Sequence, residues 1–121
     1  MEFSAGSQLA QVRPSGTTAV SAYEAGIRTE ITRVVVCNTT GAAVDFSLYH
    51  DDDGNTFDQS TALYYEVSLG ANETLEIISE SVGSGLMVAS GGQIGARASA
   101  ANALTFTLYG ITANIARSEY V

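Results

Sequence analysis

The feature that most constrains the fold is the alternation of apolar and polar residues in several short segments. Residues 44–50 alternate in this way, and residues 104–109 repeat the pattern. A period of two places one set of side chains on a buried sheet face and the other toward water or a neighbour. The pattern therefore predicts half-buried antiparallel strands, and nothing between Ile31 and Ile111 predicts a helix.

Turn-forming clusters separate these segments and set the number of strands. Gly, Asn, Asp, Ser and Thr gather at residues 38–41, 51–55, 70–72 and 90–92. Short strands with turns at this spacing are typical of a sandwich or barrel. We expect an all-β fold, an antiparallel two-sheet β-sandwich that is jelly-roll-like, with about eight strands and an extended N-terminal arm. The expected strands are 17–23, 30–38, 43–50, 63–69, 74–78, 85–90, 93–99 and 104–112.

The domain limits follow from composition. Residues 1–16 are rich in Ser and Gly and contain the one proline, so they predict an arm, in which Leu9 and Val12 could dock on a neighbour. Residues 17–112 form the sandwich domain and residues 113–121 a C-terminal tail. The apolar positions of the strands predict a core of Val34, Val36, Phe46, Leu48, Leu63, Val67, Leu75, Ile77, Phe106 and Leu108.

The charge of the chain argues against two classes of partner. The 121 residues carry a net charge of −8, and all five basic residues are arginines. Affinity for nucleic acid and for anionic membranes rests largely on Lys and Arg. We therefore expect no nucleic-acid and no membrane partner. No secretion signal or membrane span is recognisable, so we expect synthesis and assembly in a cytoplasm.

No catalytic or cofactor-binding residue is predicted, and we expect the protein not to be an enzyme. Cys37 and His50 are the single residues of their kinds, and a third orienting group is not apparent. A cysteine after three valines favours a packing role. The acidic residues lie mostly in loops or on polar strand faces, which does not suit the paired carboxylates of a glycosidase.

The acidic loop leaves two interpretations open. Asp51, Asp53, Asn55 and Asp58 are weak candidate calcium ligands around Gly54, because calcium prefers such oxygen ligands. The same residue types also form solvated turns, which is the favoured interpretation. Asn38 and Asn72 match the glycosylation acceptor pattern but are interpreted as turn residues.

Tyrosines on the strands suggest a contact surface. Tyr49, Tyr64 and Tyr109 are expected on faces opposite the core, where they could pack against another subunit or stack on sugars. Together with Leu9 and Val12 they are the candidate residues for oligomer or shell contacts. The small residues of segment 95–99 could also admit another backbone, so we expect self-association.

A longer stretch resembles known proteins. The run from Glu30 to His50, the acidic loop through Asp58, and segments 62–64, 69–74 and 105–110 are similar to small β-sandwich virion proteins of tailed bacteriophages. The resemblance implies a capsid decoration (cement) protein or a head-fibre or tail component. Its implied partner is the shell of major capsid protein, and its implied state is a homotrimer or other homo-oligomer in the virion, without a cofactor. The alternative is a tail- or fibre-associated module that recognises a host surface glycan.

Overall fold

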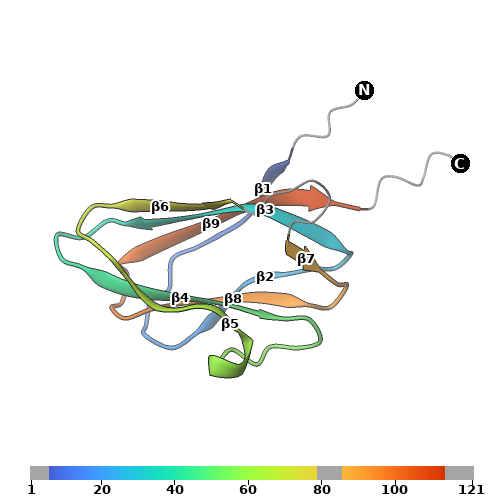
Figure 1. Cartoon of the computed structure of the whole chain (residues 1–121), viewed down its shortest axis with the longest axis horizontal. Coiled ribbons are helices and arrows are strands. Elements are labelled where there is room, and N and C mark those ends of the chain that lie inside the picture. Colours follow the sequence, from blue (N-terminus) through green and yellow to red (C-terminus); the bar gives the residue numbers. More distant parts are fainter. Residues whose placement is uncertain (1–5, 79–85, 114–121) are drawn as a thin grey trace, which may run out of the picture.

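A computed structural model describes residues 6–78 and 86–113 of the chain. In these ranges nine β-strands form two antiparallel sheets stacked face to face, and one short 3-10 helix precedes β5 (Figure 1). The elements are β1 (Ser7–Val12), β2 (Val20–Glu24), β3 (Thr29–Asn38), β4 (Val44–Asp51), η1 (Gln59–Thr61), β5 (Ala62–Leu69), β6 (Thr74–Ile78), β7 (Leu86–Val88), β8 (Gln93–Ala98) and β9 (Leu104–Thr112). No helix within these ranges is long and apolar enough to cross a membrane.

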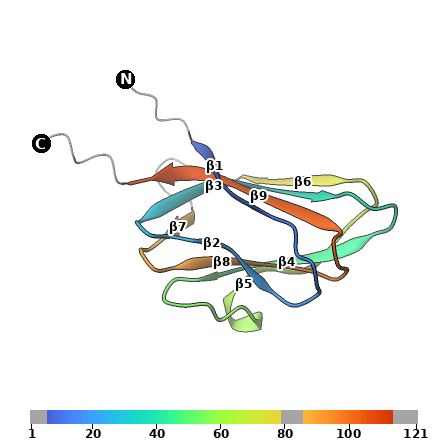
Figure 2. The same ribbon diagram turned by 180° about the vertical axis from the view of Figure 1, so that it is seen from behind.

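The strand order is that of a jelly roll. One sheet has the order β1-β9-β3-β6, with β7 also paired to β3, and the other has the order β2-β8-β4-β5. The first strand pairs with the last, β2 with β8, β3 with β6 and β4 with β5, so the chain is a long hairpin rolled into two layers. Figures 1 and 2 show the layers from opposite sides. The predicted jelly-roll-like sandwich is confirmed.

The core lies between the two sheets. Phe46 of β4 and Phe106 of β9 meet across the layers, with ring centroids 6.4 Å apart and ring planes at 66°. Six of the predicted core residues are buried, namely Val34, Val36, Phe46, Leu48, Phe106 and Leu108. Three more are half-buried against them, namely Val67, Leu75 and Ile77. The alternation of β3, β4 and β9 thus identified the inward face of these strands correctly.

The core prediction was wrong for Leu63, which is 46% exposed. Its strand β5 is irregular, because the pairing with β4 shifts register between Phe46 and Leu48 and again between Leu48 and Tyr49. Glu66 has a positive φ of 52° at the first irregularity. An extra residue in one strand changes the face that the following side chains occupy. The alternation of residues 63–69 therefore does not continue as a single buried face.

The prediction of an N-terminal arm was wrong for residues 7–12. These residues form the edge strand β1, which pairs with β9. Leu9 and Val12 pack against the core of their own domain, so they are not free to dock on a neighbour. They are three residues apart, and a register shift between Gln8 and Ala10 lets both face inward. Residues 1–5 of the predicted arm and 114–121 of the predicted tail lie outside the described residues.

Asn38 joins the turns at one end of the sandwich. The residue is 1% exposed. Its Nδ2 lies 2.9–3.0 Å from the carbonyl oxygens of Ala42, Leu69 and Gly70. Its Oδ1 accepts hydrogen bonds from the backbone N–H and the hydroxyl of Thr40, at 2.9 and 2.8 Å. Asn38 itself is the last residue of β3, and its buried side-chain amide bonds to the neighbouring turns through both its nitrogen and its oxygen.

Candidate binding cleft

The loop between β4 and β5 folds over the outer face of the β2-β8-β4-β5 sheet and is organised by its own side chains. Asp51 Oδ2 accepts a hydrogen bond from the backbone N–H of Thr56 at 2.7 Å. Asp58 begins η1 as its N-cap, and its Oδ1 accepts from the backbone N–H and hydroxyl of Ser60 at 2.8 and 2.6 Å. Thr61 completes a capping box with Asp58. Asp, Ser and Thr favour such local bonds over continued strand pairing.

Hydrogen bonds to the carboxylates also shift their pKa values. The pKa of Asp52 is lowered because its Oδ1 accepts from the Ala89 N–H at 2.8 Å and from His50 Nε2 at 2.9 Å. These bonds tie the loop to the turn that precedes β8. The pKa of Asp53 is raised, because its carboxyl group shares a hydrogen bond and negative charge with that of Asp51. The loop therefore keeps one acidic pair in close mutual contact.

The structure does not gather the predicted calcium ligands into a metal site. Asp51 and Asp58 direct carboxylate oxygens to backbone N–H groups of their own loop. Across residues 6–78 and 86–113, no group of three or more His, Cys, Asp or Glu side chains is close enough to hold a metal ion. The loop interpretation accounts for these hydrogen bonds, since each of them supports a turn or a cap.

Phe57 fixes this loop on the sheet. Its ring lies beside Tyr49 of β4, with centroids 6.0 Å apart. It also covers Gly95 of β8, where a Cβ atom would lie 2.5 Å from the Phe57 ring. Ala96 and Ala98, the next small residues of β8, are fully buried in the core. The expectation that this strand admits a second copy's backbone was therefore wrong, because the chain fills the space itself.

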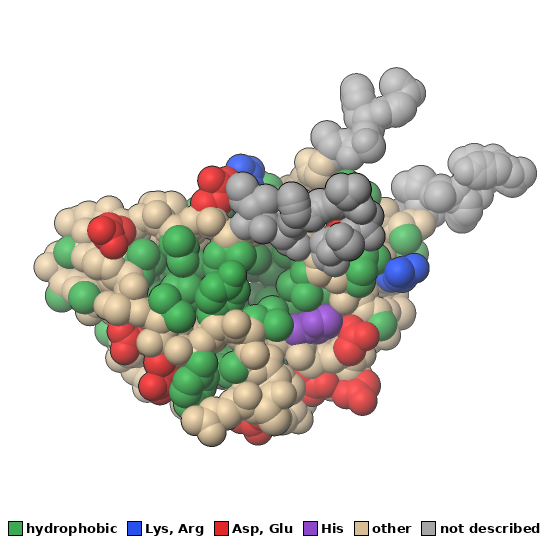
Figure 3. Space-filling model, in the orientation of Figure 1, with side chains coloured by type: hydrophobic (Ala, Val, Ile, Leu, Met, Phe, Trp, Pro, Cys, Tyr) green, Lys and Arg blue, Asp and Glu red, His purple; other side chains and the backbone are tan. Residues whose placement is uncertain are grey.

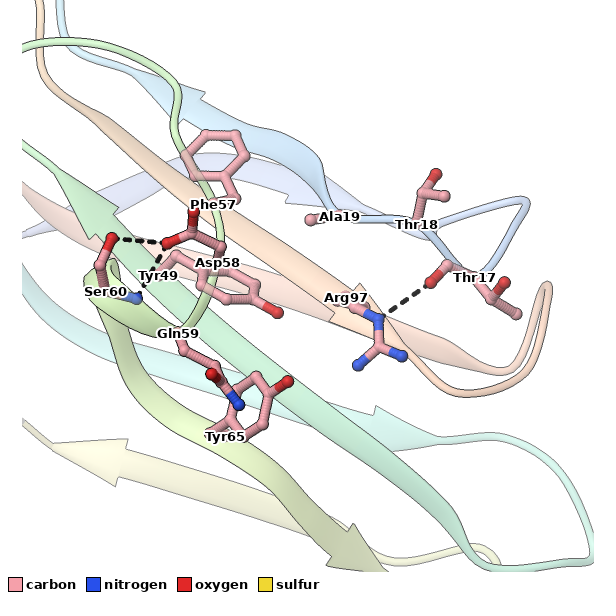
Figure 4. A pocket seen from close by; sticks show the side chains of 10 residues that line it. All are labelled: Thr17, Thr18, Ala19, Tyr49, Phe57, Asp58, Gln59, Ser60, Tyr65 and Arg97. Carbon is pink, nitrogen blue, oxygen red and sulfur yellow. Dashed lines mark hydrogen bonds between the residues drawn. The ribbon is translucent and has the colours of Figure 1, made fainter.

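A cleft of about 960 Å³ lies between this loop and the segment that leads into β2 (Figure 4). The aromatic rings of Tyr49, Phe57 and Tyr65 and the guanidinium of Arg97 line it together with short polar side chains of both walls. The wall residues are Thr17, Thr18, Ala19, Asp58, Gln59 and Ser60. A large concavity that combines aromatic and polar groups is typical of a ligand-binding site.

Two polar groups that point into the cleft retain hydrogen-bonding capacity that the described residues do not satisfy. Tyr49 is only 2% exposed, and its hydroxyl has no hydrogen-bond partner among the described residues. Figure 4 shows this hydroxyl directed toward the interior of the cleft. Arg97 donates from Nε to the Thr17 carbonyl at 3.0 Å, and its Nη1 lies 3.6 Å from Glu66 Oε2. Most buried polar groups have a partner, so the Tyr49 hydroxyl is unusual.

The predicted contact tyrosines lie on three different surfaces. The Tyr49 ring is buried beneath Phe57 and offers no face to a second subunit, so the predicted packing of this ring against a subunit was wrong. Tyr64 is 37% exposed and lines a separate cavity of about 300 Å³ at the open edge between the sheets. Tyr109 is half-buried on the outer face of the other sheet, with Arg33 4.5 Å above its ring. The alternation of apolar and polar residues along the strands does not distinguish these three environments.

Tyr65, Phe57 and Arg97 line the cleft but are not among the residues predicted to make contacts. The alternation of residues 63–69 places Tyr65 on the same face as Leu63 and Val67, but Tyr65 is 41% exposed and lines the cleft. The irregular pairing around Glu66 causes the difference. The adjacent Tyr64 was the available signal, because two neighbouring tyrosines in a strand cannot both face inward.

Cys37 and His50 do not form a nucleophilic pair. Cys37 lies near the end of β3, whereas His50 lies at the far end of β4 in the other sheet. Cys37 is a free, half-buried thiol on the outer sheet face, and His50 is bonded to Asp52. The packing role expected for the cysteine fits this position better than a catalytic one.

Replacing Gly95 with alanine is expected to displace Phe57 and lower the free energy of unfolding by about 1–3 kcal/mol, because the new methyl group overlaps the ring. Chemical denaturation measures the loss, and backbone amide shifts should change mainly in residues 51–61. Gly26→Ala is the matched control, since nothing lies within 4 Å of a Cβ at that position. Equal stability of the two variants would contradict the packing of Phe57 on Gly95.

Comparison with known proteins adds no assignment: no protein-family model matches the chain, and no curated protein is significantly similar to it.

Proposed function

We propose that this protein is a non-enzymatic structural protein of a tailed-bacteriophage virion, most specifically a capsid decoration (cement) protein that binds and stabilises the assembled head shell. The resemblance of residues 30–50 and of the later turns to small virion sandwiches supports the proposal. The jelly-roll strand order agrees with it, since this architecture recurs in viral capsid and lectin domains. Because one fold serves many functions, the surfaces must carry the argument.

The observation that carries the proposal is the unequal charge of the two outer sheet faces. The outer face of the β1-β9-β3-β6 sheet presents the neutral side chains of Val35, Cys37, Thr105, Thr107 and Tyr109, together with the charged Arg13, Arg33 and Glu76. Glu76 on this face is paired with Arg33 at 2.7 Å. The opposite side of the sandwich carries the carboxylates of Asp45, Asp51, Asp52, Asp53, Asp58 and Glu66. In Figure 3, acidic side chains gather along the lower part of the molecule, below the hydrophobic band.

A neutral, half-buried sheet face suits repeated contacts with other proteins. Charged residues are depleted at the centre of protein interfaces, because burying an unpaired charge is costly. The acidic side would then face solvent and keep the particle surface soluble. Many copies of a modest contact on one shell yield a large total binding energy. In this arrangement the neutral face lies on the shell of major capsid protein.

The test is reconstitution on capsids of the parent phage that lack this protein. Wild-type protein is expected to bind them and to raise the temperature at which they break open. Val35→Arg should abolish binding, because it places a long charged side chain in the neutral face. The change is compatible with folding, since Val35 pairs across the strands with Glu76.

Ser68→Arg is the matched control. It places the same side chain opposite Asp45 on the other sheet, so it should bind capsids like the wild type. Binding that both variants retain would assign the contact to another surface. A folded wild-type protein that ignores the capsids would overturn the decoration proposal itself.

The proposal includes a small homo-oligomer, with a trimer as the expected state. Light scattering at micromolar concentration measures it, in solution and after release from particles. Leu9, Val12 and Gly95 no longer support this expectation, since each is covered within its own domain. Tyr64, which is 37% exposed, is the remaining candidate contact between copies, and a monomer both in solution and on the particle would count against oligomerisation.

A second candidate function is recognition of a host surface glycan by a tail- or fibre-associated module. The cleft beside the β4–β5 loop favours it, because this surface combines exposed and buried aromatic rings with polar groups. Binding of the purified protein to whole host cells or to their wall polysaccharides tests this function. Such binding, without any capsid binding, would replace the decoration role.

A further inference from the structure

We infer that the cleft between the β4–β5 loop and residues 17–19 binds a neutral pyranose sugar, with the Tyr49 hydroxyl and Arg97 guanidinium as hydrogen-bonding groups and the Tyr65 ring as stacking surface. This inference rests on the second candidate function, glycan recognition, and assigns to it a site and a ligand class. Three steps lead to it, from the buried hydroxyl, the charge of the cleft and the exposed ring.

The Tyr49 hydroxyl provides the first step. Tyr49 is only 2% exposed, yet no described residue forms a hydrogen bond to its hydroxyl. Phe57 packs beside the Tyr49 ring, and Gly95 holds Phe57 in place, so the hydroxyl has a fixed direction into the cleft (Figure 4). A buried group in such a position binds a ligand hydroxyl at little cost in side-chain entropy.

The charge of the cleft provides the second step. Arg97 contributes one positive charge, Asp58 contributes one negative charge, and Glu66 lies 3.6 Å from Arg97. An acidic sugar would meet these carboxylates and a chain of net charge −8. The hydroxyl groups of a neutral sugar can donate to a carboxylate and accept from a guanidinium. The mixed cleft therefore selects a neutral ligand rather than a carboxylated one.

The Tyr65 ring provides the third step. It is 41% exposed at the wall of the cleft, on the same strand as Tyr64 but on the other side. An aromatic ring exposed beside polar groups presents an apolar face with hydrogen-bonding neighbours. That combination matches a pyranose, which has an apolar ring face and polar edges. The cleft, of about 960 Å³, is open to solvent, so a sugar ring can enter it from outside.

The experiment is a titration of the full chain followed by saturation-transfer and backbone-amide NMR. The probes are the methyl pyranosides of glucose, galactose, mannose and N-acetylglucosamine, with glucuronate as the charged counterpart. At least one neutral sugar is expected to bind and to shift residues 17–19 and 57–60, and glucuronate should bind more weakly. Tyr49→Phe should weaken binding about fivefold to tenfold, as expected for one lost hydrogen bond. Tyr65→Ala should abolish it.

Stability separates a ligand-binding hydroxyl from a structural one. Because the Tyr49 hydroxyl bonds to no described residue, Tyr49→Phe should leave the melting temperature of the free protein unchanged or raise it. Tyr109→Phe is the matched control for hydroxyl removal on the opposite sheet, and Tyr64→Ala is the control for ring removal outside the cleft. Neither control should change sugar binding.

Each contrary outcome has a defined meaning. Preferential binding of glucuronate would overturn the ligand class, and sugar binding that survives both Tyr49→Phe and Tyr65→Ala would overturn the site. Host cells bound equally by wild type and Tyr49→Phe would leave glycan recognition standing but remove this cleft from it. If neither sugars nor host cells bind, the inference and the second candidate function both fall.

Discussion

Replacing Phe46 with alanine is expected to lower the free energy of unfolding by about 3–5 kcal/mol, since the change removes a buried ring and leaves a cavity. Phe46 is 1% exposed, and its ring packs near two other aromatic rings. The centroid of Phe106 lies 6.4 Å away across the sheets, and that of Tyr64 lies 6.0 Å away on the neighbouring strand. The ring thus joins the two layers and also closes the core toward β5.

Urea denaturation of the two proteins measures this loss, with an unchanged m value showing that the unfolding reaction is the same. Ile111→Ala is the control, because Ile111 is 39% exposed at the end of β9. That variant should change the stability by less than about 1 kcal/mol. A similarly small effect for Phe46→Ala would mean that the two sheets do not pack through this ring.

Asn38→Ala should cost about 2–4 kcal/mol, because it leaves several buried backbone groups without their partner. The side chain bonds to two turns, to one through the carbonyls of Leu69 and Gly70 and to the other through the N–H of Thr40. Alanine fills none of these roles, and water has little access at 1% exposure. The loss should appear in thermal and chemical unfolding alike.

Two further variants make the Asn38 prediction specific. Asn38→Asp should be at least as destabilising as alanine, since it directs a carboxylate toward three carbonyl oxygens. Thr39→Ala is the control, because Thr39 is exposed and its hydroxyl makes one 3.3 Å bond to Ala103. An Asn38→Ala protein as stable as Thr39→Ala would show that the turns do not depend on this side chain.

The strand pattern was predictable where pairing is regular. The strands predicted at 30–38, 43–50, 74–78 and 104–112 differ from β3, β4, β6 and β9 by no more than one residue at either end. Their alternation depends only on the local pleat, which places every second side chain on one face. The acidic loop was likewise predictable as a turn, since Asp, Ser and Thr bond to neighbouring backbone groups whatever the remaining fold.

Prediction failed where the partner strand decides the geometry. Leu63 and Tyr65 follow the alternation of a regular strand, but the register shifts opposite β4 place both at the surface. Leu9 and Val12 break the alternation, yet the shift within β1 turns both inward. An irregularity of this kind belongs to a pair of strands, so one strand's sequence does not contain it.

By itself the sequence determined that this chain is an acidic, all-β protein whose apolar residues face one side of each regular strand. These properties follow from composition and from the two-residue period of an extended backbone. Only the tertiary structure decided that Phe57 lies on Gly95, and that Tyr49 is buried with its hydroxyl directed into a cleft beside Arg97. These groups come from β4, β8 and the loop between β4 and β5, and they meet because strands distant in sequence pair side by side in the rolled-up sheet.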